Sequence, residues 1–452
     1  MWTRPVVTAI VLLATSAMLG HVDASSAKPA AASFLYTVTR KYDASAWLAG
    51  RERFPLGAKL FMQSGNERRP LMREFAASAD AAVSFDGTRV LFAGKRTASD
   101  PWQIYEVSVA GGEARRVTSG TEDCIRPLYL PEDRVVYARR ISGRFVIEVA
   151  PLAGGKPLPL TYAPGSFLPT DVLRDGRVLF EGAYPDGSGS STELYTVYSD
   201  GSGVESYRCD HGHARDSGKQ VDSGDIVFVS NHGLSRFTSA LAHEVPIAAP
   251  AGEYAGDVAE MSTGEWLLAW RSDAQKPFQL KRWKPGSSTL ESVAAAEDEN
   301  FVQPAVVAPR PVANRHPSGL HDWAYANLLC LNAYTSKYSF PNGSIGSVRL
   351  YAQGTAGQEK PLGTAPVEGD GSFYLRTPAD QPLKIELLDR SGRTLKKEAG
   401  WFWLRRGEQR VCVGCHAGPE TAPENAVPAV LQRSIIPADM TGAAVAAPQG
   451  GH

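Results

Sequence analysis

The chain has 452 residues, in which 47 Lys and Arg nearly balance 48 Asp and Glu, with 43 Gly, 31 Pro and five Cys. This balance excludes the strong charge bias that attracts nucleic acid or anionic lipid. The many Gly and Pro, with aromatic residues and Val in short runs, predict a mainly β fold of two or three domains.

The first 27 residues have the pattern of a secretory signal peptide. Arg4 provides a positive start, residues 6–19 are apolar, and small residues suited to cleavage follow at 22–27. The apolar run is shorter than the ~20 residues of a membrane span, so an uncleaved anchor is the weaker alternative. We expect a periplasmic or secreted protein whose mature chain does not span a membrane.

A strand pattern recurs between residues 34 and 310. Turns beginning at residues 86, 132, 175, 223 and 263 each lead into an alternating apolar strand, and the spacing is 40 to 48 residues. Repeats of this length predict a β-propeller, because one blade cannot bury its own faces. Residues 34–74 supply part of a further blade and residues 301–307 a closing strand, which gives six blades.

The turn Ser84-Phe85-Asp86-Gly87 before one of these strands resembles the turns of TolB-like propellers. That resemblance implies a propeller over residues 34–310, and for most of these residues a purely structural role is the better interpretation. One loop departs from the pattern, because Cys209, His211 and His213 stand together there. Such residue types suit a zinc or other metal site, although short Asp, Gly and His clusters also build ordinary turns.

A Pro-rich stretch, residues 304–317, predicts an extended linker. Short strands and turns over residues 311–400 then predict a small β-sandwich-like domain. Residues 401–440 are expected to be an irregular haem-binding segment, and residues 441–452 a disordered tail. Trp401, Phe402 and Trp403 lie just before the haem motif, where they could cover a porphyrin or fill the core of the small domain.

The motif Cys412-Val-Gly-Cys415-His416 is typical of a covalent c-type haem site. The two thiols add to the haem vinyl groups, and His416 can ligate the iron from one side. The alternatives are a redox disulfide or half of a zinc site. Cys330 is a further metal candidate, but a buried free thiol is the more ordinary reading of such a cysteine.

The second axial position of the iron has three candidate ligands. Met440 follows the motif by 24 residues, and a thioether ligand would raise the potential. His321 stands beside Asp322, which could orient its ring, and His316 lies in the linker. A haem with two protein ligands transfers electrons, whereas one with an open position can do chemistry.

The order of these segments resembles the hydrazine synthase alpha subunit-like family, most specifically over residues 365–416. The resemblance implies a six-bladed propeller, a β-rich middle domain and haem c on Cys412 and Cys415. In the enzyme, a Tyr shortly after the motif ligates the catalytic haem and the motif His binds zinc. Here Glu420 stands four residues after His416, no Tyr follows, and there is one CxxCH motif.

Two functions remain in view. The first is an exported mono-haem protein that transfers electrons or catalyses a haem-dependent oxidoreduction with a redox partner or small substrate, though not hydrazine synthesis itself. The second is a non-catalytic propeller that binds or scaffolds partners in the cell envelope. Covalently retained haem would separate the two.

Overall fold

The computed structural model describes residues 32–183, 192–208, 212–354, 357–415 and 425–442. These residues form strands almost throughout, in accord with the predicted mainly β fold, and their one helix is α1 (Ala429–Arg433). Among them, no helix has the length and apolar character that crossing a membrane requires.

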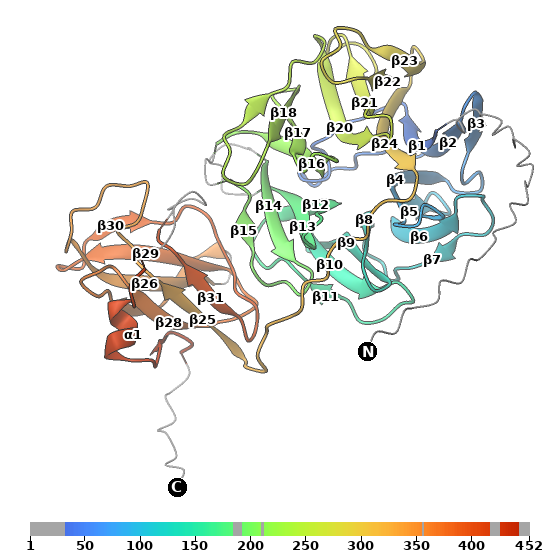
Figure 1. Cartoon of the computed structure of the whole chain (residues 1–452). Coiled ribbons are helices and arrows are strands. Elements are labelled where there is room, and N and C mark those ends of the chain that lie inside the picture. Colours follow the sequence, from blue (N-terminus) through green and yellow to red (C-terminus); the bar gives the residue numbers. More distant parts are fainter. Residues whose placement is uncertain (1–31, 184–191, 209–211, 355–356, 416–424, 443–452) are drawn as a thin grey trace, which may run out of the picture. The chain divides into compact units, whose positions relative to one another are not determined.

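Six four-stranded sheets, the blades of a propeller, follow one another from Ser33 to Val307 (Figure 1). The first three blades are formed by β24 (Asn300–Val307), β1 (Ser33–Thr39), β2 (Lys59–Ser64) and β3 (Glu67–Pro70); β4 (Ala77–Val83), β5 (Arg89–Lys95), β6 (Gln103–Ser108) and β7 (Arg115–Arg116); and β8 (Cys124–Leu130), β9 (Arg134–Ile141), β10 (Arg144–Pro151) and β11 (Leu158–Pro159).

The other three blades have the same antiparallel order. They are formed by β12 (Ser166–Val172), β13 (Arg177–Ala183), β14 (Glu193–Tyr198) and β15 (Glu205–Ser206); β16 (Arg215–Gln220), β17 (Ile226–Ser230), β18 (Gly233–Phe237) and β19 (Val245–Pro246); and β20 (Glu253–Glu260), β21 (Trp266–Arg271), β22 (Gln279–Trp283) and β23 (Glu291–Ala294). The five repeated sequence patterns form strands, as predicted, and each is the second strand of its blade.

The turns before these second strands are fixed by short polar side chains. Asp86 accepts hydrogen bonds from the Ser84 hydroxyl (2.5 Å) and the Thr88 amide (3.0 Å). Gly87 follows at φ +74°, a conformation that glycine adopts without steric strain. The turn chemistry therefore sets the blade period that the sequence shows.

The remaining blade joins both ends of the propeller. β24 pairs antiparallel with β1, with Ser33 opposite Val307 and Thr39 opposite Asn300. The innermost strands β4, β8, β12, β16, β20 and β24 contact one another in sequence, and β24 contacts β4. The predicted closing strand at residues 301–307 therefore completes the ring.

Every innermost strand carries an irregularity in its pairing with the neighbouring strand. At four of these places a residue other than glycine has positive φ: Asp80, Arg126, Ser217 and Gln303. A β-bulge turns side chains away from the regular alternation of the strand. The six bulges therefore gather polar groups around the propeller axis.

The linker after β24 is extended and bonded to the propeller. The Arg310 amide donates to the carbonyl of Phe85 (2.8 Å), and the Asn314 amide donates to that of Arg174 (2.8 Å). A Cβ atom on Gly176 would lie 2.2 Å from the Asn314 carbonyl oxygen, so only glycine lets the linker approach this turn. The linker is therefore held against the surface of the propeller rather than free in solution.

The C-terminal region forms two further four-stranded sheets. Their orders are β31-β25-β28-β32 and β27-β26-β29-β30. The strands are β25 (Tyr325–Cys330), β26 (Ile345–Gln353), β27 (Glu359–Pro366), β28 (Phe373–Pro378), β29 (Leu383–Asp389), β30 (Thr394–Lys397), β31 (Gln409–Cys412) and β32 (Ala438–Asp439). Buried side chains of both sheets, including Leu328, Leu350 and Leu375, pack into one core.

The segment predicted to be irregular, 401–440, differs from that expectation in part. β31 and β32 are the two edge strands of one sheet of this small domain. The sequence pattern missed them because each pairs in parallel with a strand far away in the chain, β31 with β25 and β32 with β28. Short edge strands also lack the alternating pattern of a strand with one buried face.

Candidate functional site

The first half of the CxxC motif extends the edge strand β31. β31 runs parallel to β25, and Cys412 is the register partner of Cys330. Beyond the strand, the Leu331 amide donates to the Cys412 carbonyl (2.9 Å), and the Asn332 amide donates to the Val413 carbonyl (3.2 Å). The motif therefore begins on a backbone ladder rather than on a free loop.

The spacer between the two thiols fits against the turn that follows β25. A Cβ atom on Gly414 would lie 2.0 Å from the Thr335 carbonyl oxygen and 2.8 Å from that of Asn332. The turn is itself fixed, because the Asn332 side chain accepts the Tyr334 amide (2.9 Å). Glycine is therefore required at position 414, and the close packing sets where Cys415 lies.

Three cysteines meet where β25 and β31 end: Cys330, Cys412 and Cys415, here called the cysteine corner. None forms a disulfide; Cys412 and Cys415 are half-buried, and Cys330 is 2% exposed. A hydrogen bond between the side chains of Cys330 and Cys415, together with burial, raises the pKa of the Cys330 thiol. Burial likewise raises the pKa of the Cys412 thiol to about 11.

The chain returns to this corner after residue 424. The Ala429 amide donates to the Asp370 carboxylate (2.7 Å), and the Val430 amide donates to the Ser372 hydroxyl (3.0 Å). Asp370 and Ser372 flank Gly371, whose carbonyl accepts the Ala333 amide. Ala333 directly follows Asn332 of the turn after β25. Val411 on β31 and, on the returning segment, Val427, Ile435 and Ile436 are exposed apolar side chains.

Several predicted ligands cannot be placed. His416 and Glu420 lie outside the described residues, as do Cys209 and His211. His213 is described and is exposed. Within the described ranges, no three or more His, Cys, Asp or Glu residues are grouped so that they could hold a metal ion. Cys124 is fully buried and unpaired in the propeller.

The three candidates for the second axial position are not gathered at the cysteine corner. Met440 is 3% exposed in the core of the small domain, and its amide donates to the Arg376 carbonyl. It directly follows β32, which is the edge strand opposite β31 in the sheet. The His321 ring stacks on Trp323 before β25 begins, so it lies at the other end of that strand from Cys330. The His316 ring stacks on Tyr198 of a propeller blade.

Trp403, in the aromatic run before the motif, packs against the propeller, a role outside the two alternatives that the sequence offered, covering a porphyrin or filling the core of the small domain. Trp403 is 1% exposed, contacts Phe167 of the propeller and donates its indole N–H to the Leu160 carbonyl (3.1 Å). Phe402 is half-buried against the core of the small domain, whereas the half-buried Trp401 packs against the same propeller cluster as Trp403 and contacts Lys384. Trp403 therefore anchors the segment that leads into β31.

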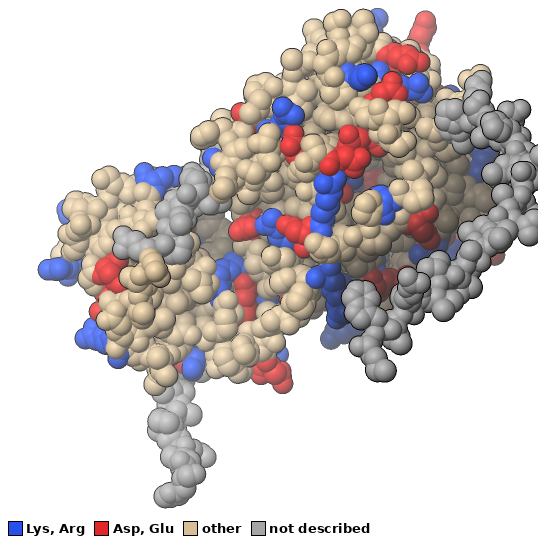
Figure 2. All heavy atoms as spheres, viewed as in Figure 1, with Lys and Arg blue, Asp and Glu red and all other residues tan. Residues whose placement is uncertain are grey.

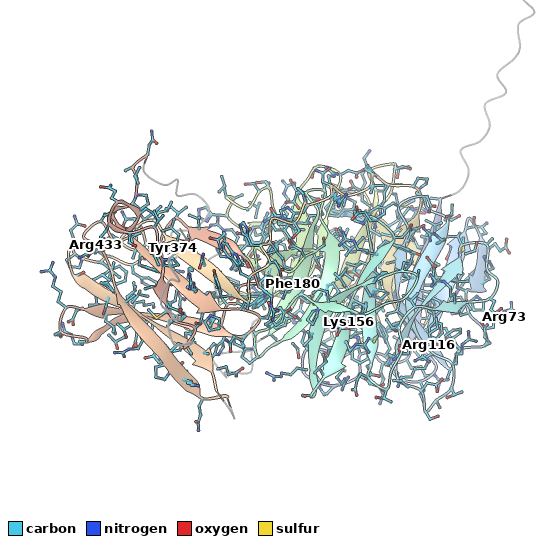
Figure 3. All side chains as sticks on the ribbon, turned by 90° about the horizontal axis from the view of Figure 1, so that it is seen from below. Arg73, Arg116, Lys156, Phe180, Tyr374 and Arg433 are labelled. Carbon is cyan, nitrogen blue, oxygen red and sulfur yellow. The ribbon has the colours of Figure 1, made fainter. Side chains whose placement is uncertain are left out.

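Charged residues continue this anchor up to the motif. The Arg405 guanidinium donates to the Asp200 carbonyl (3.1 Å) and pairs with Asp380. Glu408 accepts the Gly203 amide (3.1 Å), and Arg410 pairs with Glu408 (2.6 Å). Tyr374 on β28, labelled in Figure 3, donates to the Gln409 side chain (3.4 Å). The strand that carries Cys412 is thus positioned from both sides.

A second polar site, which sequence reasoning missed, lies on the propeller axis. Gln303 donates to the Asp80 carboxylate (2.6 Å), which also accepts the Arg126 amide (3.2 Å). Arg126 in turn makes two hydrogen bonds to Asp257 (2.8 and 3.0 Å). We call these four residues the axial ring. Only the positive φ of the bulges brings them together, and no local sequence motif encodes it.

One buried carboxyl group beside the axial ring, that of Asp216, has a raised pKa. Asp216 has an oxygen without solvent contact or hydrogen-bond partner among the described residues. Burial, and then the negative charge of nearby Glu181, raises the pKa of Asp216 to about 7. Glu181 itself accepts hydrogen bonds from Arg53 (3.4 Å) and from the Ser217 amide (2.9 Å).

Comparison with known proteins gives matching results for sequence and fold. The model of the hydrazine synthase alpha subunit middle domain matches residues 335–417. The hydrazine synthase subunit alpha of Kuenenia stuttgartiensis is 36% identical over 66 residues, a match that spans 14% of this chain and 8% of that protein.

Solved structures extend the likeness over most of the chain. Hydrazine synthase from Kuenenia stuttgartiensis superposes with a TM-score of 0.76 at 16% identity, covering 89% of this chain and 72% of that one. TolB from Acinetobacter baumannii superposes with a TM-score of 0.47 at 13% identity, covering 61% of this chain and 67% of that one. Cys412 and Cys415 of the cysteine corner lie within the matched range, and Cys330 precedes it, so residues 335–417 are similar to the middle domain of the hydrazine synthase alpha subunit.

Proposed function

We propose that this protein carries one covalent c-type haem on Cys412 and Cys415 and works outside the cytoplasm as an electron-transfer protein or haem-dependent oxidoreductase. The main supporting observation is a pair of free thiols, Cys412 and Cys415, separated by two residues at an open sheet edge. His416 is the proposed axial ligand of the iron. Bound there, haem c supplies one-electron redox chemistry.

The residues of the corner fit such a group. A haem with two thioether bonds needs both sulfurs free and a spacer of defined shape, and the packing of Gly414 against Thr335 provides that shape. A porphyrin also needs apolar surface to cover. Val411 is 57% exposed beside Cys412, and Ile435 and Ile436 are 80% and 73% exposed on the returning segment.

The propeller would support haem binding by holding the strand of the motif in place. Trp403, Arg405 and Glu408 bond the strand of the motif to the propeller. On the face shown in Figure 2, acidic and basic side chains are interspersed, without a large area of one sign. A redox partner would therefore dock mainly through shape and apolar contact rather than through a strong charge field.

The test is covalent haem retention. The chain, expressed with a c-type haem maturation system, should keep its haem absorption after denaturation and gain the mass of one haem. Replacing Cys412 and Cys415 together by Ala should abolish this retention, because no other thiol pair has the two-residue spacing. The matched control is Cys124→Ala, which removes a buried free thiol of the propeller and should retain haem.

Further measurements define the iron ligands. His416→Ala should leave the thioether bonds intact and change the absorption of the iron. Carbon monoxide that binds the reduced protein rapidly would indicate an open axial position and catalysis, whereas resistance would indicate two protein ligands and electron transfer. A chain that emerges from maturation without covalent haem would contradict the proposal and favour a binding or scaffold protein of the cell envelope.

A further inference from the structure

The cysteine corner holds one more thiol than haem attachment uses. Cys330 is the register partner of Cys412 on the adjacent parallel strand, and its side chain is hydrogen-bonded to that of Cys415. The strand pairing places Cys330 beside Cys412, and Cys415 packs against the same buried cluster that contains Cys330. The hydrogen bond already brings the sulfurs of Cys330 and Cys415 together, so a disulfide between them needs only a small movement.

We propose that Cys330 is a third redox-active thiol, which forms a disulfide with Cys415 in the haem-free chain and thereby decides whether the CxxC pair can receive haem. The disulfide itself depends only on the described residues. Its control over haem attachment rests on the proposed function. While the Cys330–Cys415 bond exists, the Cys415 sulfur cannot form a thioether, and one of the two haem linkages is blocked.

The partner of Cys330 follows from the geometry. The thiol of Cys415 is the one hydrogen-bonded to Cys330, and it lies in the turn after the strand, where it is half-buried. Cys412 is held on β31 by the backbone ladder with β25.

The reaction is a thiol–disulfide exchange with an organic disulfide, either small or carried by another protein. The thiolate of Cys415, the more exposed of the two, attacks that disulfide, forms a mixed disulfide and releases one thiol. The sulfur of Cys330 then displaces the second thiol. The two cysteines lose two protons and two electrons, and the organic disulfide is reduced to two thiols. A reducing dithiol reverses both steps before haem is attached.

The first experiment needs no variant. The haem-free full-length chain is treated with oxidised glutathione, its remaining thiols are alkylated, and peptides are mapped without reduction. We expect a cross-link between the peptides of Cys330 and Cys415, with loss of alkylation at both, while Cys412 and Cys124 remain alkylated. A Cys412–Cys415 cross-link with Cys330 still alkylated would overturn the proposal.

The second experiment tests the control over haem. Wild type and Cys330→Ala are matured with haem under oxidising conditions and again with added dithiol. We expect Cys330→Ala to retain more covalent haem than wild type when oxidised and an equal amount when reduced. Equal yields under both conditions, despite the cross-link, would overturn the control step. If neither protein retains haem even when reduced, the proposed function fails, while the cross-link map still decides whether the disulfide forms. Circular dichroism confirms that the variant folds.

Discussion

The axial ring of the propeller and the cysteine corner of the small domain both place reactive groups away from water, but in different ways. In the axial ring, Arg126 and Asp257 satisfy each other with two hydrogen bonds, and Asp80 is bonded by Gln303. In the cysteine corner, burial is the largest influence on the pKa of Cys412 and outweighs the nearby positive charge of Arg410. Groups that satisfy one another hold a fold together, whereas groups left without partners remain available for chemistry.

The largest expected effect concerns the axial ring. Arg126→Ala leaves the buried Asp257 carboxylate without its counter-charge, and removing one partner of a buried ion pair typically lowers the free energy of unfolding by about 3–5 kcal/mol. Urea denaturation followed by fluorescence measures the change. Arg393→Ala, at an ion pair whose Arg side chain is 80% exposed, is the control and should change stability by less than about 0.5 kcal/mol. A small loss in Arg126→Ala would show that the ring is not structural.

Trp403→Ala should have the next largest effect. It removes a buried side chain and the hydrogen bond to Leu160 at the junction between the propeller and the small domain, with an expected loss of roughly 3 kcal/mol. Limited proteolysis should cut the variant near residues 403–410 before it cuts the propeller. Phe402→Ala, at a half-buried neighbour that faces the small domain, should be less damaging. Equal proteolysis of the two variants would contradict the anchoring role.

Gly414→Ala tests whether the cysteine corner depends on its spacer. The new methyl group would collide with the Thr335 carbonyl, and the expected loss is about 1–3 kcal/mol, together with lower covalent haem yield at equal expression. Gly369→Ala is the matched control, because a Cβ atom there meets nothing within 4 Å. Unchanged haem yield in Gly414→Ala would show that the spacer tolerates other shapes.

The final expected effect is a pH dependence from Asp216. Its pKa is about 7 in the folded chain against an ordinary value of 3.8, so the folded state favours the protonated form. This contribution is fully present below about pH 4 and is lost as the pH rises towards 7. Asp216→Asn should therefore gain roughly 1.4 kcal/mol relative to wild type for each pH unit between about pH 5 and pH 7. A pH-independent difference in the urea midpoints would contradict this assignment.

Local signals predicted the blades, and non-local contacts explain what was missed. The Asp86-Gly87 turn and its copies gave the blade period because turn residues act within a few positions. Cys330, by contrast, reaches Cys412 only through parallel pairing across 82 positions of sequence, from 330 to 412. The contact of Trp403 with Leu160 and the bulge at Arg126 likewise depend on tertiary packing. Met440 had the spacing of a ligand but serves the core, because spacing carries no information on which sheet edge a strand joins.

The pairing of β24 with β1 also constrains how the chain folds. β1 pairs with β2 on one side, but its other side is paired only when β24 is available, so the ring cannot close while the propeller is still being synthesised. Contacts of such long sequence separation slow folding, because a large loop must close before the pairing is gained. Until then β1 is an unpaired edge that could join another chain. Folding of the propeller is thus complete only after its last strand, β24, has been synthesised and has paired with β1.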